Sequence, residues 1–230
     1  MAAVYVSMAS LLKSGDHGLA CRSLFGSTHQ ILTRLFPRWG ISFSYADIGA
    51  PESWAALIQP NTRLIFVETP SNPGLDIIDL AAVGALARER EIPLIVDNCF
   101  TTPYLQQPIK FGASLVVHSA TKFLDGQGRV LGGLIAGSSK LIAEARFFAR
   151  HTGPAMSPFN AWVLSKSLET LAVRMDRHCS NALALARHFE GHPELESGRY
   201  PGLPSHPQYE LASRQSTQGG GVLVLVPPGR

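Results

Sequence analysis

Cysteine is scarce in this sequence. Three cysteines, Cys21, Cys99 and Cys179, occur in 230 residues, and no two of them form a Cys-x-x-Cys pair. An odd number of widely spaced cysteines does not build a disulfide framework, so we expect free thiols and a reducing, cytoplasmic environment. Cys99 follows an aspartate by two residues, which leaves a reactive role open, although a buried structural thiol is the more common situation.

Charge and long apolar runs are also scarce. Charged residues make up 16% of the chain, the formal net charge is +3, and no basic run is present, so a nucleic-acid partner is not expected. No apolar run is long enough to cross a membrane, and the N-terminal residues lack the basic and cleavage regions of a signal peptide. With 45% hydrophobic residues, the chain is expected to be a soluble globular protein with a sizeable core.

The glycine motifs of nucleotide-binding proteins are missing as well. Gly126, Gly128 and Gly132 lie close together, but their spacing does not match Gly-x-Gly-x-x-Gly, and they precede a strand instead of joining a strand to a helix. No Gly-x-x-x-x-Gly-Lys-Ser/Thr P-loop occurs. A dinucleotide-binding oxidoreductase is therefore the weaker alternative.

Strand-like and helix-like segments alternate along the chain with short connections. Strands are expected at 17–21, 41–45, 63–67, 93–97, 115–117, 134–137 and 219–226. Helices are expected at 1–13, 26–36, 51–57, 78–90, 138–149 and, as one long element with a stripe of Leu164, Leu168, Leu171, Met175 and Leu183, 158–190. Alternation of this kind is typical of an α/β protein with a mostly parallel, doubly wound sheet.

One strand is followed directly by two hydroxyl groups and an amine. Ser119, Thr121 and Lys122 come after the apolar run 115–117. Ligands of open α/β sheets bind beyond the carboxyl ends of the strands, so this cluster suggests a phosphorylated cofactor that is held covalently. Taken alone, the same residues are also consistent with a solvated strand edge and an ordinary turn.

The preceding strand, 93–97, delivers Asp97 to the same edge of the sheet. An acid and an amine on neighbouring strands suit pyridoxal phosphate, which needs a lysine for its Schiff base and a carboxylate on its pyridinium nitrogen. That carboxylate keeps the ring nitrogen protonated and makes the ring an electron sink. Asp97 as a helix cap or a metal ligand remains an alternative, although no nearby cluster has the spacing of metal ligands.

Several segments in the same order resemble a known family, the Cys/Met-metabolism PLP enzymes of the cystathionine γ-synthase-like group of fold type I. The resemblance covers essentially all of the chain, and its strongest segments are 68–73, 96–98, 102–106, 118–122 and 202–207. It implies a mostly parallel, seven-stranded-type sheet flanked by helices, followed by the start of a small C-terminal α+β domain. Residues 1–168 would be the PLP-binding large domain, and residues 169–230 the linking helix and the beginning of the small domain.

Within this family the chain is most similar to the O-succinylhomoserine sulfhydrylase branch. The loop 125–129, the segments 158–162 and 168–171, and Phe25 at a position where most relatives have tyrosine carry that similarity. It implies γ-replacement on an O-acylated homoserine, with succinyl as the expected acyl group and sulfide as the nucleophile, to give homocysteine for methionine biosynthesis. Cystathionine γ-synthase or γ-lyase activity is the alternative, and the missing hydroxyl of Phe25 weakens the lyase.

The resemblance also implies roles for individual residues. Lys122 would be catalytic and would hold pyridoxal phosphate, while Asp97 would pair with its ring nitrogen. The other expected cofactor-binding residues are Ser119 and Thr121 at the phosphate, Phe25 stacked on the ring, Asn72 and Glu68 near the phenolic oxygen, and Met1 at the phosphate loop. An amino acid is the expected substrate, and a dimer or tetramer is expected for the full-length form.

Some family features are not found in this sequence. Met1 matches the methionine of the family's Ser-Gly-Met-Ala-Ala phosphate loop, but the glycine before it, an upstream Tyr-x-Arg segment and a downstream carboxylate-binding arginine are missing. We therefore expect a central portion of a longer enzyme, truncated at both ends. A catalytically incompetent fragment of such an enzyme is the alternative from a different functional class.

Overall fold

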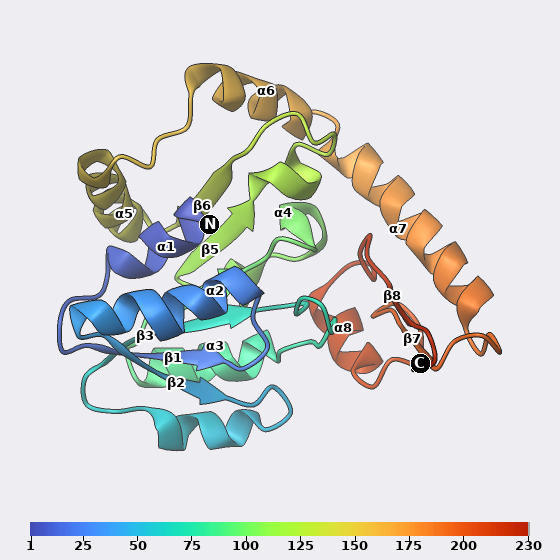
Figure 1. Ribbon diagram of the computed structural model, residues 1–230, viewed down its shortest axis with the longest axis horizontal. Coiled ribbons are helices and arrows are strands. Elements are labelled where there is room, and N and C mark those ends of the chain that lie inside the picture. Colours follow the sequence, from blue (N-terminus) through green and yellow to red (C-terminus); the bar gives the residue numbers. More distant parts are fainter. Residues whose placement is uncertain (230) are drawn as a thin grey trace.

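A six-stranded mixed sheet forms the centre of the protein in a computed structural model that describes residues 1–229 (Figure 1). The strand order is β2-β1-β3-β4-β5-β6. The strands are β1 (His17–Cys21), β2 (Ser42–Ala46), β3 (Thr62–Glu68), β4 (Leu94–Asp97), β5 (Leu115–Ser119) and β6 (Gly133–Gly137). Strands β1 to β5 run parallel, and β6 lies antiparallel beside β5. The inner strands are apolar and buried because helices cover both faces of a parallel sheet.

Helices alternate with the strands and continue beyond them. The helices are α1 (Ala2–Ala9), α2 (Gly26–Gln30), α3 (Leu80–Glu89), α4 (Thr102–Leu105), α5 (Ser139–Thr152), α6 (Pro158–Leu168), α7 (Leu171–Phe189) and α8 (Tyr209–Gln215). Shorter π and 3-10 turns are η1 (Ile31–Leu35), η2 (Phe36–Trp39), η3 (Pro51–Leu57), η4 (Pro108–Phe111) and η5 (Ala120–Leu124). Within residues 1–229, no helix has both the length and the apolar character needed to cross a membrane.

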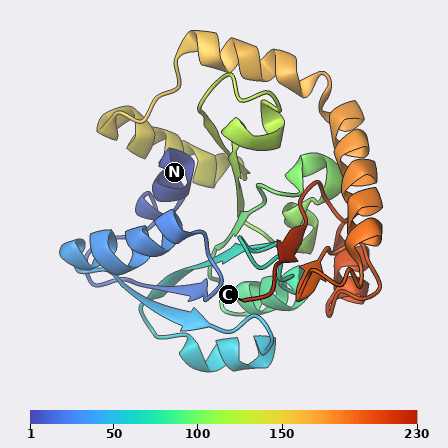
Figure 2. The ribbon, with the colours of Figure 1, turned by 45° about the vertical axis from the view of Figure 1, so that its right-hand side comes forward.

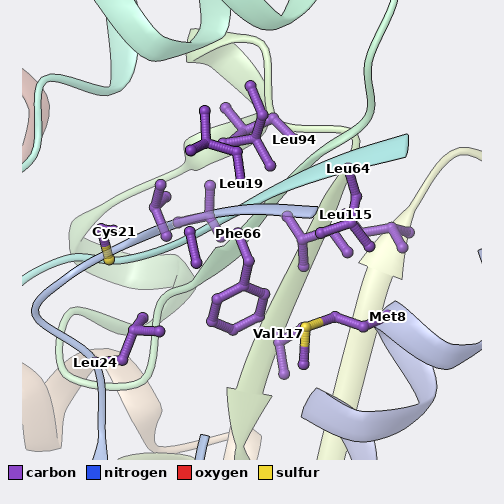
Figure 3. Packing of buried hydrophobic residues seen from close by; sticks show 14 of the residues in the cluster. Met8, Leu19, Cys21, Leu24, Leu64, Phe66, Leu94, Leu115 and Val117 are labelled. Atoms are coloured by element: carbon purple, nitrogen blue, oxygen red, sulfur yellow. The ribbon is translucent and has the colours of Figure 1, made fainter. Parts of the chain in front are cut away.

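The main core lies between the sheet and helix α1. Met8 of α1, Phe66 of β3 and Val117 of β5 are fully buried, and Figure 3 shows Met8 against Val117 with the Phe66 ring beside them. Each such side chain contributes roughly 1.5–3 kcal/mol when it is removed from water. The packing of α1 on β5 is what brings the start of that helix to the edge where Lys122 lies.

The C-terminal part forms a second, smaller unit. Helix α7 leads to an antiparallel pair, β7 (Ser197–Arg199) and β8 (Val224–Val226), and to α8 (Figure 2). Arg199 Nη2 lies 2.8 Å from Asp76 Oδ1, and Gln215 Nε2 donates to Ile78 O at 3.0 Å. The unit is therefore fastened to the segment that precedes α3.

The structure confirms the α/β class and the mostly parallel sheet, with differences in detail. The main sheet has six strands within the described residues, where the resemblance implied a seven-stranded type. Helix α1 stops at Ala9 instead of residue 13, and the expected helix 26–36 passes from α-helix through a π turn to a 3-10 turn. The last strand covers only 224–226, and Gly219 lies outside it, where an added Cβ would be 2.6 Å from Gly202 N.

The predicted single helix over 158–190 is wrong. Helix α6 ends at Leu168, and α7 begins at Leu171 after Thr170, whose φ of −111° and ψ of 6° are not helical. Leu168 is consequently 43% exposed and leaves the apolar stripe, whereas Met175 is fully buried. A periodicity of apolar residues does not reveal such a break, because the stripe resumes in the second helix.

Candidate active site

Two carboxyl groups lie side by side where two parallel strands end. Glu68 closes β3, Asp97 closes β4, and the two residues are paired in register. Each residue is only 7% exposed. The alternation of strands and helices produces this arrangement, because parallel strands deliver their last residues to one edge of the sheet.

The pair binds a proton at neutral pH. Burial, and then the negative charge of Asp97, raises the pKa of Glu68 to about 8, against the lowering effect of backbone N–H groups of Phe25 and Asn72. Burial also raises the pKa of Asp97, while hydrogen bonds from Cys99 and the positive charge of the Met1 amino group lower it. Glu68 is therefore the carboxyl group of the pair that holds a proton at neutral pH.

The Asp97 carboxylate forms no ion pair within residues 1–229, although the positive charge of the Met1 amino group lowers its pKa. None of the ion pairs among residues 1–229 includes Asp97 or Glu68. Asp97 Oδ1 accepts the Cys99 N–H at 3.1 Å, which leaves most of its acceptor capacity unused. A buried carboxylate of this kind is costly unless a positively charged partner joins it. A protonated pyridine nitrogen would meet that need.

The amine and hydroxyl groups follow on the next strand. Ser119 ends β5, and its N–H donates to Cys99 Sγ at 2.7 Å, which joins the ends of β4 and β5. Thr121 and Lys122 lie in turn η5, where Lys122 has φ −83° and ψ −125° and an exposed side chain. The Thr121 hydroxyl accepts the Gly132 N–H at 3.2 Å. The amine is thus free to react, while the backbone around it is held.

The Glu68 carboxyl attracts the backbone N–H groups of both Phe25 and Asn72. The Phe25 N–H donates to Glu68 Oε2 at 2.7 Å, and the backbone N–H of Asn72 also points to this carboxyl. The Phe25 side chain is 42% exposed, so its ring is available at the surface of the site. Glu68 therefore fixes the loops that carry both residues.

A groove lies beside Thr121 and the start of α1, and neither Ser119 nor Lys122 lines it. Its volume is about 510 Å³, and its lining includes Met1, Thr121, Gly132 and Arg146. The amide groups that begin a helix, together with hydroxyls, suit a phosphate. Lysine, a carboxylate without an ion-pair partner among residues 1–229, two hydroxyls and a helix start form a donor and acceptor set that fits pyridoxal phosphate. Among residues 1–229, no group of three or more His, Cys, Asp and Glu side chains is arranged to hold a metal ion.

A buried amide network behind Asp97 has no counterpart in the sequence-based site. Asn98, which is fully buried, receives hydrogen bonds at its Oδ1 from Thr101 Oγ1 at 2.6 Å and Gln106 Nε2 at 2.7 Å. Gln106 Nε2 also reaches Thr69 O at 3.3 Å. The network therefore ties the loop after β3 to the loop after β4. In the sequence, the only sign of this network is the resemblance of segment 102–106 to the family.

Replacing Gln106 with alanine is expected to lower the free energy of unfolding by roughly 2–4 kcal/mol, since Asn98 Oδ1 and Thr69 O lose a donor in a buried place. Urea unfolding followed by circular dichroism measures the change. Gln107→Ala is the matched control, because Gln107 is exposed, and it should alter stability by less than about 0.5 kcal/mol. Equal effects of the two substitutions would contradict the tie between the loops.

Replacing Glu68 with glutamine is expected to flatten the pH dependence of stability in the chain without cofactor. The folded Glu68 keeps a proton up to a pKa of about 8, against an ordinary value of 4.5, so its contribution is complete below pH 4.5 and is lost as the pH rises toward 8. Neutral glutamine can still accept the Phe25 N–H. From about pH 5 to about pH 8, the variant should gain on the order of 2 kcal/mol relative to wild type.

Urea unfolding at these two pH values measures that gain. Glu52→Gln is the control, because Glu52 is exposed on η3. If wild type and Glu68→Gln showed the same slope of stability against pH, Glu68 would not be the group that holds the proton.

Comparisons with known proteins identify the family of this chain. Residues 1–226 match the family model described as Cys/Met metabolism PLP-dependent enzyme. An O-succinylhomoserine sulfhydrylase from Pseudomonas aeruginosa is 49% identical over 97% of this chain and 55% of its own length. An L-methionine gamma-lyase from Porphyromonas gingivalis is 41% identical over 93% of this chain and 54% of its own length. The chain thus spans about half the length of these curated relatives.

A solved structure has the same fold. The crystal structure of metB from Corynebacterium glutamicum superimposes with a TM-score of 0.94 at 40% identity, and the match covers 98% of this chain and 59% of that one. The family match, the identity to its relatives and the arrangement of Asp97 and Lys122 at one sheet edge lead to one conclusion. The chain belongs to the Cys/Met metabolism family of PLP-dependent enzymes, whose cofactor is pyridoxal phosphate.

Proposed function

We propose that this chain supplies the cofactor-holding core of an enzyme that replaces the γ-acyloxy group of an O-acylated homoserine with sulfide. The observation that carries the proposal is the exposed Lys122 on the turn after β5, the strand beside β4, together with the buried Asp97–Glu68 pair, which forms no ion pair within residues 1–229. The homoserine ester is expected to carry a succinyl group, and the product is homocysteine, a precursor of methionine.

The proposed roles follow from where each side chain lies. Lys122 Nζ binds the cofactor covalently and, once released by the substrate amine, moves protons at the substrate's α and β carbons. Asp97 holds a proton at the ring nitrogen. Pyridoxal phosphate, when bound, supplies an electron sink for the bonds that break next to the substrate amine.

The remaining residues hold and cover the cofactor. Ser119, Thr121 and the start of α1 at Met1 bind the phosphate. Phe25 covers the ring and excludes water, which is worth roughly 0.5–1.5 kcal/mol beyond its buried area. Asn72 lies at the phenolic oxygen and the substrate carboxylate, and Glu68 keeps Asn72 and Phe25 in place through their N–H groups.

Sulfide replacement is preferred over the related reactions for two reasons. Identity to the sulfhydrylase relative is 49%, against 41% to the γ-lyase relative. Phe25 has no hydroxyl with which to carry a proton, and this weakens elimination as the main reaction. Cystathionine formation from cysteine is the alternative replacement reaction on the same site.

We also propose a division of the chain into two parts. Residues 1–168 form the PLP-binding large domain, and residues 169–230 form the linking helix and the start of a smaller domain. The break between α6 and α7 and the separate pair β7–β8 support this boundary. An assembly of two or four subunits and a cytoplasmic location, which the three free thiols favour, belong to the same proposal.

The test is cofactor retention followed by turnover of the purified chain. Pyridoxal phosphate is added, the chain is desalted, and the visible spectrum is recorded before borohydride reduction and peptide mapping. O-succinylhomoserine and O-acetylhomoserine are then supplied with sulfide or cysteine, and methionine alone tests the lyase. Retained cofactor and homocysteine formation from the succinyl ester and sulfide support the proposal. A folded chain that retains no cofactor would identify it as a catalytically incompetent fragment.

A further inference from the structure

The turn that carries Lys122 is not stabilised by a regular helix. Lys122 has a ψ of −125°, which interrupts turn η5, so the helical pattern of backbone hydrogen bonds is not continuous there. Within the turn, the Asp125 N–H donates to Ala120 O at 2.9 Å and the Gly126 N–H donates to Lys122 O at 2.8 Å. The carbonyls of Phe123 and Leu124 are left for other donors.

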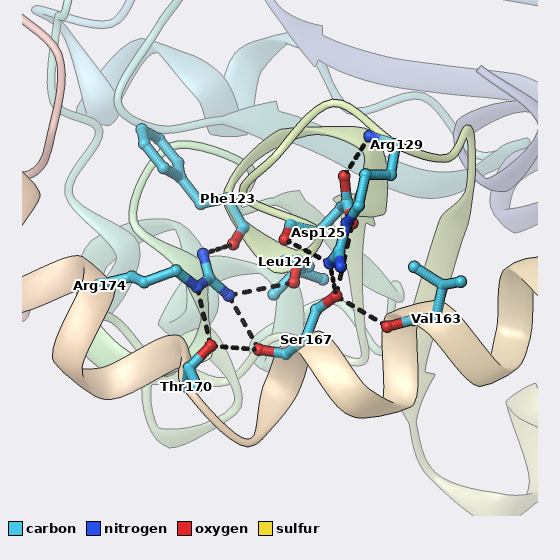
Figure 4. Close-up of polar contacts among 8 residues, drawn as sticks. All are labelled: Phe123, Leu124, Asp125, Arg129, Val163, Ser167, Thr170 and Arg174. Atoms are coloured by element: carbon cyan, nitrogen blue, oxygen red, sulfur yellow. Dashed lines mark hydrogen bonds and ion pairs between the residues drawn. The ribbon is translucent and has the colours of Figure 1, made fainter.

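Arg174 of helix α7 supplies those donors. Its Nη1 donates to Phe123 O at 2.6 Å, and its Nη2 donates to Leu124 O at 3.3 Å (Figure 4). The same guanidinium reaches the corner between α6 and α7, with Nη2 donating to Ser167 O at 2.9 Å and Nε donating to Thr170 Oγ1 at 3.1 Å. Only a planar group with several N–H donors in fixed directions can hold four acceptors in this way.

A second arm fastens the far side of the turn. Asp125 is fully buried and accepts the Arg129 backbone N–H at 2.7 Å and Arg129 Nη2 at 2.9 Å. Arg129 Nη2 also donates to Ser167 Oγ at 2.6 Å, and this hydroxyl donates to Val163 O at 2.7 Å. Arg174 and Arg129 therefore both bind Ser167 near the end of α6. The loop 125–129 thus helps to hold the Lys122 turn against α6.

Gly126 leaves the space that the Arg174 guanidinium occupies. A Cβ at this position would lie 2.0 Å from Arg174 Nη1, and the residue has φ +74°. Glycine satisfies both requirements, because it has no Cβ and adopts a positive φ without strain. A methyl group here would push the guanidinium away from its acceptors, although Arg174 and its positive charge would still be present.

We propose that Arg174 is a positioning residue for Lys122, fixing from helix α7 the backbone of the turn that presents the amine. The proposal rests on the proposed function in so far as Lys122 is the residue that holds the cofactor. Arg174 does not touch the cofactor or the substrate in this role. It acts through the carbonyls of Phe123 and Leu124, which follow Lys122 directly.

The first experiment needs no cofactor. Amide hydrogen exchange is measured on the chain without pyridoxal phosphate for wild type, Arg174→Met, Arg174→Lys and Gly126→Ala. Exchange of the amides of residues 124–126 is expected to rise about 10-fold in Arg174→Met and less in Arg174→Lys, whereas the amides of α3 remain unchanged. Arg177→Met, at an exposed position on the same helix, is the matched control and should leave residues 124–126 unchanged.

Gly126→Ala provides an independent check on the same contact. It should raise exchange of residues 124–126 in wild type, and its effect should be smaller in the Arg174→Met background, since the clash with the guanidinium is then gone. Equal effects in both backgrounds would mean that Gly126 does not act through Arg174, and the proposal would be wrong in that part.

The second experiment uses the chain loaded with pyridoxal phosphate. Arg174→Met is expected to lower kcat about 10-fold with little change in KM, and to shift the pH at which the cofactor absorbance of Lys122 changes, with partial rescue in Arg174→Lys. If Arg174→Met lost only thermal stability and kept its exchange, absorbance and kcat, the role would be merely structural. If wild type retained no cofactor, the proposed function would fail, while the exchange comparison would still decide whether Arg174 holds the turn.

Discussion

Replacing Lys122 with alanine is expected to abolish covalent retention of pyridoxal phosphate and to lower turnover by roughly 10³-fold or more. The residue combines two tasks, since its amine holds the cofactor and moves protons at the substrate. Its side chain is exposed on turn η5, so removing it opens no cavity in the core, and the fold should survive. Absorbance after desalting and steady-state kinetics with the succinyl ester and sulfide measure the two losses.

Lys166→Ala is the control for this prediction. Lys166 is also exposed, and it pairs with Glu169 at 2.7 Å on the outside of α6. An exposed pair of this kind is worth less than about 1 kcal/mol, so cofactor retention and turnover should be unchanged. A cofactor adduct that survives in Lys122→Ala after borohydride reduction would show that another lysine holds the cofactor.

Replacing Asp97 with asparagine is expected to weaken pyridoxal phosphate binding by roughly 10- to 100-fold, because a charge-assisted hydrogen bond of roughly 1.5–3 kcal/mol to the ring nitrogen is lost. The chain without cofactor should respond in the opposite direction. The charge of Asp97 helps to raise the pKa of Glu68, so its removal should lower that pKa and stabilise the chain at alkaline pH.

Opposite signs in the two states distinguish a cofactor ligand from a structural residue. Titration with pyridoxal phosphate measures the first effect, and urea unfolding at about pH 8 measures the second. Asp47→Asn is the control, because Asp47 is exposed and paired only with Arg22. If Asp97→Asn weakened the chain without cofactor and left cofactor affinity intact, Asp97 would serve the fold and not the cofactor.

The residues at the carboxyl edge of the sheet fall into two groups with different proposed roles. Lys122 and Asp97 are proposed to act on the cofactor directly, while Glu68 holds the Phe25 and Asn72 loops and Arg174 holds the Lys122 turn. Glu68 is buried, and the guanidinium of Arg174 makes four hydrogen bonds. Substitutions in this second group are expected to change rates and pH profiles before they remove activity.

The positions of the inner strands along the chain, and the mostly parallel character of the sheet, were predictable from sequence alone. The apolar runs that became β3, β4 and β5 lie within two residues of their expected bounds. Parallel strands bury both faces, so a continuous apolar run is sufficient to mark them. The same reasoning placed Asp97 and the cluster of Ser119, Thr121 and Lys122 at one edge of the sheet.

The ends of elements and the breaks between them were less predictable. The separation of α6 from α7 depends on Ser167 and Thr170, whose backbone and hydroxyl groups bond to Arg174. The local pattern of apolar residues does not reveal the break between the two helices. Segment 102–106 resembles the family, but this resemblance does not show its hydrogen bonds. The bonds from Gln106 to Asn98 and to Thr69 O form only when β3 and β4 lie side by side.

The sequence by itself thus determined the α/β class, the family and the residues that end each strand, because these depend on local composition and on the rule that parallel strands end at one edge. Only the tertiary structure decided that the pKa of Glu68 is raised by burial and by Asp97, that Cys99 links Asp97 to Ser119, and that Arg174 holds the Lys122 turn from about 50 residues away in the chain. A pKa depends on burial and on neighbouring charge, and a hydrogen bond depends on direction within a few tenths of an ångström. Neither quantity exists until distant segments have packed together.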